Sequence, residues 1–285
     1  MKRRAFLQNS GSAATMAAMG APVFGLENKP LIQLGLVTYN WGKAWDLATL
    51  LKVCEVMEYA GVELRSTHAH KVEPDLSKTE RADVKKRFAD SPVELYGLGT
   101  ACEYHSADPA VLKRNIEETK AFIHLAHDVG ASGIKVRPNG LPKDVPVEKT
   151  LEQIGKSLDE VAAHGSEHGV EIRTEVHGRG TAEIAKFVEI MKHSQHENST
   201  VCWNCNPADL EGEGLAKNWE ALRKRVHEIH IHDLRNKDSY PWEEFFALLK
   251  KTKFSGWTLV EEGKVPDDVP KAMKEVRAEW ERLTG

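Results

Sequence analysis

The sequence predicts a single-domain (β/α)8 (TIM) barrel that follows an N-terminal export signal. Strand-like runs alternate with helical patterns, eight such pairs occur in about 250 residues, and this total matches the size of a (β/α)8 barrel. Most of the predicted strands also alternate apolar with polar side chains. This alternation suits a barrel strand, because its outer face packs under helices while its inner face opens into a polar mouth.

The first 25 residues, MKRRAFLQNSGSAATMAAMGAPVFG, have the pattern of an export signal. A basic start is followed by small, mildly apolar residues, and the stretch is too short for a stable membrane span. Arg3 and Arg4 precede Ala-Phe-Leu, which resembles a twin-arginine signal, whose pathway carries folded proteins. We therefore expect residues 1–25 to direct export to the periplasm and residues 30–285 to form the barrel. We expect no membrane span in the mature protein.

The eight predicted strands follow one another at fairly even intervals. They read LIQLGLVTY from residue 31, GVELRS from 61, VELYGLGT from 93, SGIKVRP from 132, GVEIRTEVH from 169, STVCWNCN from 199, VHEIHIHD from 226 and GWTLVEEG from 256. Apolar residues three and four apart predict helices in the intervening stretches, such as 44–59, 110–129, 147–168, 181–195 and 267–283. An open doubly wound sheet is the alternative, but its strands would be apolar on both faces.

Charge and cysteine content exclude some classes of function. A net charge of −4 and a pI near 6.4 give no global attraction to nucleic acid. The CWNC segment at 202–205 invites a redox or zinc interpretation. In a strand, however, residues three apart point to opposite faces, so the sulfur atoms of Cys202 and Cys205 should diverge.

Polar side chains from the last four predicted strands should meet at the barrel mouth. In VHEIHIHD, Ile229 and Ile231 would face outward while His230 and His232 face inward. The same register brings Glu175, Asn204 and Glu261 from the neighbouring strands to the mouth. A lone strand histidine is more often structural, but carboxylate, imidazole and amide groups together suit Mn²⁺, Mg²⁺, Co²⁺ or Zn²⁺. The convergence of several strand ends favours a metal site.

Three of these segments, GVEIRTEVHG, IHIHDL and GWTLVEEG, resemble the xylose isomerase-like barrels grouped as sugar phosphate isomerases and epimerases. The resemblance covers roughly residues 31–283. It implies a divalent-metal-dependent isomerase or epimerase acting on a carbohydrate by proton transfer alpha to a carbonyl, with a metal as Lewis acid. The implied catalytic carboxylates are Glu175 and Glu261, and the implied metal ligands are Glu175, Asn204, His230 and Glu261.

The sixth strand departs from the pattern of that family. Where the family usually reads Asp-x-x-His, this chain has Asn204 and Pro207. A neutral amide brings no charge to offset desolvation of the cation, so metal affinity should drop or the substrate should complete the shell.

Other strand ends are expected to shape a sugar-binding pocket with cations, imidazoles and carboxylates. The predicted substrate-binding residues are Glu63, Arg65, His68, His70, Glu103, Lys135, Arg137, His177 and His232. Internal ion pairing is an equal interpretation for Arg65, Lys135 and Arg137, because charges deep in a barrel need partners. Lys135 with Glu171 is one such possible pair.

Three alternative functions remain open. A lyase acting on a keto-sugar or keto-glycoside would use the same proton abstraction. A non-catalytic sugar-binding protein would explain Asn204 and Pro207. A DNA-repair endonuclease would need more metal ligands, and an acidic exported chain argues against it. Export favours a non-phosphorylated sugar, whereas the exact substrate, the native metal and the oligomeric state stay open.

Overall fold

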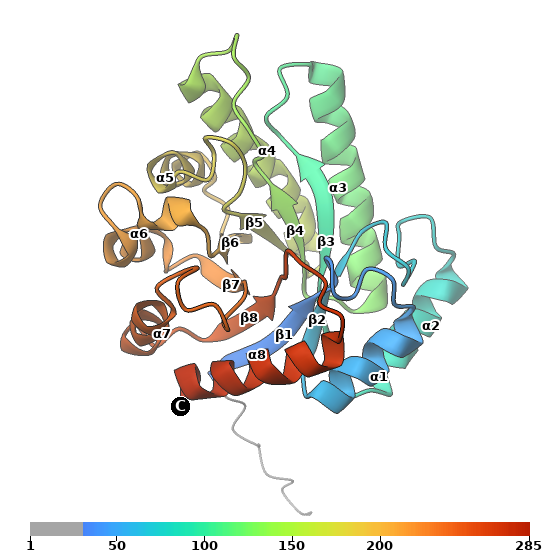
Figure 1. Ribbon diagram of the computed structural model, residues 1–285. Helices are drawn as coiled ribbons and strands as arrows, with labels where there is room; N and C mark the ends of the chain where they lie inside the picture. The colour runs from blue at the N-terminus through green and yellow to red at the C-terminus, as the bar shows by residue number, and fades with distance from the viewer. Residues whose placement is uncertain (1–30) are drawn as a thin grey trace, which may run out of the picture. The chain divides into compact units, whose positions relative to one another are not determined.

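A computed structural model describes residues 31–285, and in it eight parallel strands close into one barrel (Figure 1). Each strand pairs with the next in chain order, and β8 (Gly256–Val260) pairs with β1 (Ile32–Val37) to close the sheet. The predicted (β/α)8 barrel is therefore confirmed. The predicted export signal at 1–25 lies outside the described residues.

The strands between the first and the last alternate with helices that surround the barrel (Figure 1). The strands are β2 (Gly61–Arg65), β3 (Glu94–Glu103), β4 (Gly133–Arg137), β5 (Glu171–Glu175), β6 (Ser199–Asn204) and β7 (Val226–Ile231). The helices are α1 (Leu47–Met57), α2 (Lys78–Ala89), α3 (Pro109–Val129), α4 (Val147–Glu167), α5 (Ile184–Lys192), α6 (Leu215–Leu222), α7 (Trp242–Lys251) and α8 (Val269–Thr284), with a 3-10 turn η1 at Pro207–Leu210.

Side-chain oxygens cap several helices where the chain leaves the barrel mouth. Asp46, Asp108 and Asp268 each accept a hydrogen bond from the first turn of the helix that follows. Ser77 and Glu80 form a capping box at the start of α2. Such caps satisfy backbone N–H groups that have no partner within the helix, so they fix where each loop ends.

The main apolar core lies between the outer face of the sheet and the helices. Ile229 and Ile231 of β7 are fully buried in it, as the alternating pattern predicted. Trp203 of β6 belongs to the same layer, where its ring lies 5.5 Å from that of Trp219 and 6.1 Å from that of Phe245. Trp203 therefore packs in the core and does not face the mouth.

A second, smaller cluster fills the floor of the barrel. Tyr96 and Trp257 stack there at 5.0 Å, and the Arg173 guanidinium lies 3.7 Å above the Tyr96 ring. Arg173 also pairs with Glu171 at 2.7 Å and approaches Glu228 at 3.5 Å. These inward charges support the polar residues above them, so the alternating polar positions of β5 and β7 do face inward.

The described cysteines are buried and none forms a disulfide. Cys205 packs in the outer core, whereas Cys202 has His230 as a neighbour inside the barrel. The two sulfur atoms thus point to opposite faces of the sheet, as expected. No helix within residues 31–285 has the length and apolar character needed to cross a membrane.

The inward placement of Arg173 depends on Gly133, since a Cβ at that position would lie 2.6 Å from the Arg173 guanidinium carbon. We expect Gly133→Ala to lower the free energy of unfolding by about 1–3 kcal/mol, as overpacking does in buried sites. Denaturant unfolding measures this change. Gly263→Ala is the control, because nothing lies within 4 Å of its added Cβ, and equal stability of the two variants would contradict this packing.

Candidate metal centre at the barrel mouth

Glu175, His230 and Glu261 come together where β5, β7 and β8 end. One ligand atom of each lies within 4.8 Å of the other two. His230 Nδ1 is 3.4 Å from Glu261 Oε2 and 4.0 Å from Glu175 Oε1. The first two residues are buried, and only 13% of the Glu261 side chain is exposed. The strand ends therefore converge as the alternating pattern predicted.

The His230 ring is held so that one nitrogen faces the two carboxylates. Its Nε2 lies 2.8 Å from Glu228 Oε1. Burial opposes ionisation of Glu228, but His230 and Arg173 outweigh it and lower the pKa of this carboxyl. An ionised carboxylate only accepts, so Nε2 carries a hydrogen and Nδ1 faces the mouth. Burial opposes the charge on His230, but Cys202, Glu261 and Glu228 outweigh it and raise the pKa of the ring, so a cation at Nδ1 would compete with a proton. This buried Nδ1 has no hydrogen-bond partner.

Lys135 fixes the Glu175 carboxylate from the opposite side. Its Nζ lies 2.7 Å from Glu175 Oε2, and both side chains are only 3% exposed. Burial opposes the charge on Lys135, but Glu175 and Glu63 outweigh it and raise its pKa. Lys135 thus has an ion-pair partner, as the alternative interpretation required, although that partner is Glu175. Glu171 instead pairs with Arg173 and His227.

The surrounding charges keep the two mouth carboxylates ionised. Burial alone would raise the pKa of Glu261, but His230 and Lys135 hold it at about 2. Burial likewise opposes ionisation of Glu175, and Lys135 outweighs it, so this pKa is also lowered. Glu63 differs: burial and the Glu228 charge raise its pKa, and neither of its oxygens has a hydrogen-bond partner. Glu63 therefore lies under the centre as a carboxyl that is harder to ionise than Glu175 or Glu261.

The Asn204 carboxamide lies between Glu175 and His232. Its Nδ2 donates to Glu175 Oε1 at 3.0 Å, and its Oδ1 is 2.8 Å from His232 Nε2. His232 Nδ1 must carry a hydrogen, because it lies 2.7 Å from the backbone carbonyl of Glu261, which only accepts. In a neutral ring Nε2 is then an acceptor. A 180° rotation of the Asn204 side-chain amide would let Nδ2 donate to His232 Nε2 and would turn Oδ1 toward Glu175.

These residues fit a divalent cation. Two ionised carboxylates face an imidazole nitrogen that is buried, oriented by Glu228 and without a hydrogen bond, which is how metal-ligating histidines are usually held. The Asn204 oxygen can complete the set after the half turn described above. A mixed nitrogen and oxygen donor set suits Mn²⁺, Co²⁺ or Zn²⁺. Glu175, His230, Glu261 and Asn204 are the residues that would hold it.

A second network lines the rim at the ends of β3 and β4. Glu103 accepts from Arg137 Nη2 at 2.8 Å and from the Asn139 amide. Asn139 Oδ1 in turn lies 2.8 Å from His177 Nδ1. Three predicted pocket residues thus meet, and Asn139 links them. The sequence prediction missed Asn139, whose backbone has a φ of 61°; its place after the fourth strand was the only signal.

The two histidines of the loop after β2 have different surroundings. His70 is buried, with Nε2 bonded to the Arg65 carbonyl and Nδ1 accepting from the Val72 backbone. Both ring nitrogens are thus used by the loop itself, and the substrate-binding role expected of His70 stays a prediction. His68 is half-buried, and burial and His70 lower its pKa to about 4, which leaves the ring neutral at pH 7.

Arg65 lies at the end of β2 with a partly exposed side chain. Its guanidinium donates to the Ser66 hydroxyl and to the Gly99 carbonyl. It forms no ion pair with any carboxylate of residues 31–285. Of the three cations predicted near the mouth, Lys135 and Arg137 are therefore ion-paired, whereas Arg65 bonds only to neutral groups.

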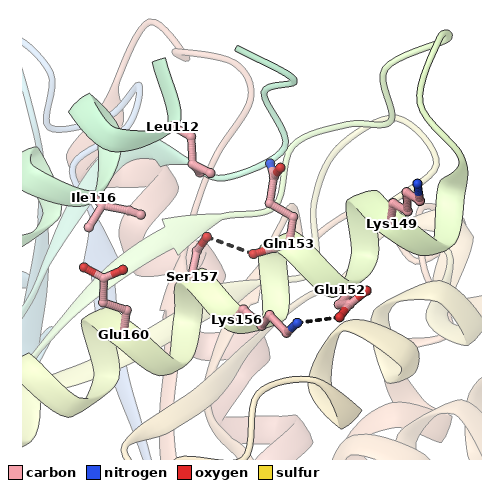
Figure 2. A pocket seen from close by; sticks show the side chains of 8 residues that line it. All are labelled: Leu112, Ile116, Lys149, Glu152, Gln153, Lys156, Ser157 and Glu160. Carbon is pink, nitrogen blue, oxygen red and sulfur yellow. Dashed lines mark hydrogen bonds and ion pairs between the residues drawn. The ribbon is translucent and has the colours of Figure 1, made fainter. Parts of the chain in front are cut away.

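Two cavities outside the metal centre differ in character. One of about 700 Å³ lies beside the mouth, with His232, Arg235, Trp242 and Glu262 in its wall. Another of about 480 Å³ lies between α3 and α4 on the outside of the barrel (Figure 2). In its wall Lys156 pairs with Glu152, and Glu160 pairs with Lys120 outside the wall, so these charges do not converge on a reactive centre.

Fold and site together define a TIM barrel whose polar groups gather at the C-terminal ends of its strands, where enzymes of this fold have their active sites. The profile of the xylose isomerase-like TIM barrel family matches residues 51–283. The chain belongs to this family. No curated protein matches the sequence.

Solved structures with a similar fold include three informative cases. A 3-keto-D-glucoside 4-epimerase from E. coli is 12% identical, with a TM-score of 0.74, over 88% of this chain and 99% of that one. An L-ribulose 3-epimerase is 14% identical, with a TM-score of 0.75, over 89% and 94%. The IolI protein, solved with a zinc atom, is 16% identical, with a TM-score of 0.74, over 88% and 98%.

We expect Asn204→Asp to tighten binding of Mn²⁺ or Zn²⁺ by roughly tenfold or more, because the number of charged ligands tunes such sites. Without metal the added charge would face Glu175, so the thermal midpoint should fall. Titration calorimetry and melting in chelator measure the two effects. Asn236→Asp, in the exposed loop after β7, is the control for net charge. Unchanged affinity in Asn204→Asp would show that position 204 does not touch the cation.

Proposed function

We propose that this protein is a divalent-metal-dependent isomerase or epimerase of a sugar or sugar derivative. The observation that carries the proposal is the buried His230 Nδ1, which has no hydrogen bond and faces Glu175 and Glu261. Similarity of fold to proteins described as sugar epimerases, and to one solved with zinc, supports the same choice.

The two carboxylates are suited to moving a proton at the carbon alpha to a sugar carbonyl. Glu175 comes from β5 and Glu261 from β8, so they approach a bound sugar from different sides. One carboxylate would take the proton and the other would return one from the opposite face, which inverts the stereocentre. When bound, the cation would supply Lewis-acid stabilisation of the negative charge that develops on the sugar.

Lys135 positions one of these carboxylates and leaves the other freer to move. It holds Glu175 Oε2, while Glu175 Oε1 accepts from Asn204. Within residues 31–285 the Glu261 carboxylate forms no hydrogen bond and lies 3.4 Å from His230 Nδ1. Glu261 is therefore the carboxylate that can change position most easily when the substrate enters.

The rim residues would bind sugar hydroxyl groups. Glu103, Arg137 and His177 already form one network, and His68 offers a neutral ring. A phosphate group would need unpaired cations, and of the predicted pocket cations only Arg65 lacks a carboxylate partner within residues 31–285. The proposed substrate is thus a non-phosphorylated carbohydrate. Export to the periplasm through the twin-arginine pathway, which we also propose, agrees with this choice.

The cavity of about 700 Å³ favours a second candidate, a lyase acting on a keto-glycoside. It lies next to the metal centre through His232, and its wall carries Trp242, Arg235 and Asp233. A group attached to the reacting sugar has room there. The chemistry would begin with the same proton abstraction, and a leaving group would then depart from the neighbouring carbon.

We expect Glu175→Gln to lower solvent-deuterium exchange into a ketose or keto-glucoside by about 10²–10⁴-fold, the usual loss when a general base is removed. Mass spectrometry of the recovered sugar measures the exchange. Glu189→Gln, at a partly exposed position of the outer helix α5, should exchange like the unaltered protein. Exchange at the normal rate in Glu175→Gln, with metal still bound, would remove this residue from the base role.

Incubation of the metal-loaded protein with a free ketose and with a 3-keto-glycoside separates the candidate functions. An isomerase or epimerase would give a new sugar from either class, and chelation would stop the reaction. A lyase would release the attached group from the glycoside only. Binding of sugar without exchange or product, with metal present or absent, would instead indicate a non-catalytic sugar-binding protein.

A further inference from the structure

A second group of potential metal ligands lies on the outside of the barrel, on the helices and not at the strand ends that form the mouth. It consists of His124 on α3, His164 in the last turn of α4, and His168 directly after α4. One ring nitrogen of each lies within 4.8 Å of the other two. Two of these side chains are partly buried and His124 is exposed, so the group is open to solvent.

The distances within this histidine cluster match those between ligands of one ion. His124 Nε2 and His164 Nε2 are 3.4 Å apart. Zinc–nitrogen bonds of about 2.0–2.1 Å in a tetrahedral site place two ligand nitrogens about 3.3–3.4 Å apart. The same separation is long for a hydrogen bond, which usually spans about 2.7–3.2 Å. The two nitrogens are therefore spaced for a shared ion.

Backbone hydrogen bonds set the orientation of His168. Its Nδ1 lies 2.9 Å from the His164 carbonyl, which only accepts, so Nδ1 carries the hydrogen and Nε2 keeps its lone pair. His127 Nδ1 lies 2.8 Å from the His168 carbonyl and so fixes the chain there. The His168 ring centre is 4.5 Å from that of His124 and 4.6 Å from that of His164. Ligating histidines are commonly oriented by such bonds to carbonyls.

The histidine cluster has no carboxylate partners within residues 31–285 that would stabilise three neighbouring charged imidazoles. Within residues 31–285, none of these three rings forms an ion pair with a carboxylate. Three imidazolium rings at this separation would repel one another, whereas neutral rings present lone pairs. Neutral imidazole is the form that binds transition metals.

We propose that His124, His164 and His168 form a surface site for a divalent transition metal such as Zn²⁺, with water as the remaining ligand. The site joins α3, the end of α4 and the turn at Gly169 that leads into β5. Because α4 ends just before β5 begins, the site lies at the opposite end of the strands from the mouth. A bound ion would link α3 to the end of α4, and this role does not depend on the proposed sugar chemistry.

The test measures Zn²⁺ stoichiometry by equilibrium dialysis and Co²⁺ binding by its visible absorption, on the full chain. Glu261→Gln weakens the mouth site and should still bind Zn²⁺ at the histidine cluster. The double variant Glu261→Gln/His164→Ala should bind Zn²⁺ at the cluster at least tenfold more weakly. Loss of a residue that only orients a ligand already costs about 10–100-fold in metal affinity. Zn²⁺ should raise the thermal midpoint of Glu261→Gln and should not raise that of the double variant.

Controls separate loss of the site from loss of the fold. His193→Ala, combined with Glu261→Gln, removes a partly exposed histidine outside the cluster and should leave Zn²⁺ binding unchanged. Circular dichroism in chelator should show that all variants are folded. The proposal is overturned if Glu261→Gln binds no Zn²⁺ outside the mouth, or if His164→Ala binds as tightly as His193→Ala. Failure of sugar turnover in the unaltered protein would leave this result unaffected.

Discussion

The buried ion pair between Lys135 and Glu175 is the interaction on which the geometry of the mouth depends. Both side chains lie inside the barrel, where an unpaired charge is costly, and removing one member of such a pair costs about 3–5 kcal/mol. The pair fixes one oxygen of Glu175 and leaves the other to face His230 and Asn204. The possible ligand atoms at the centre are therefore arranged around the Glu175 carboxylate, which cannot turn freely.

The barrel interior changes character with depth. Tyr96 and Trp257 close the floor, and Arg173 lies on them and supports Glu228. Glu228 then orients the His230 ring, so its Nδ1 points upward to the mouth. Each level thus supports the next, from an apolar floor through paired charges to His230 Nδ1, which has no hydrogen-bond partner.

The sequence predicted which side chains face into the barrel better than it predicted which of them pair with each other. The alternation in VHEIHIHD placed Ile229 and Ile231 in the outer core and His230 inward, because a strand has a period of two. The same alternation gives no distances across the barrel. It therefore leaves Glu171 as a possible partner of Lys135, whereas the structure pairs Lys135 with Glu175. Loops have no such period, and only the structure showed that the backbone occupies both nitrogens of His70.

Asn204 shows why the chain's departure from its family pattern is compatible with a metal centre. A carboxamide, unlike an aspartate, has two different ends, and each suits a different neighbour. With Nδ2 toward Glu175 it stabilises the carboxylates when no cation is there to balance them. With Oδ1 toward Glu175, and His232 accepting from Nδ2, it offers a ligand. At the proposed metal centre the neutral side chain would avoid a third negative charge before a cation binds, at the expense of weaker attraction for the ion.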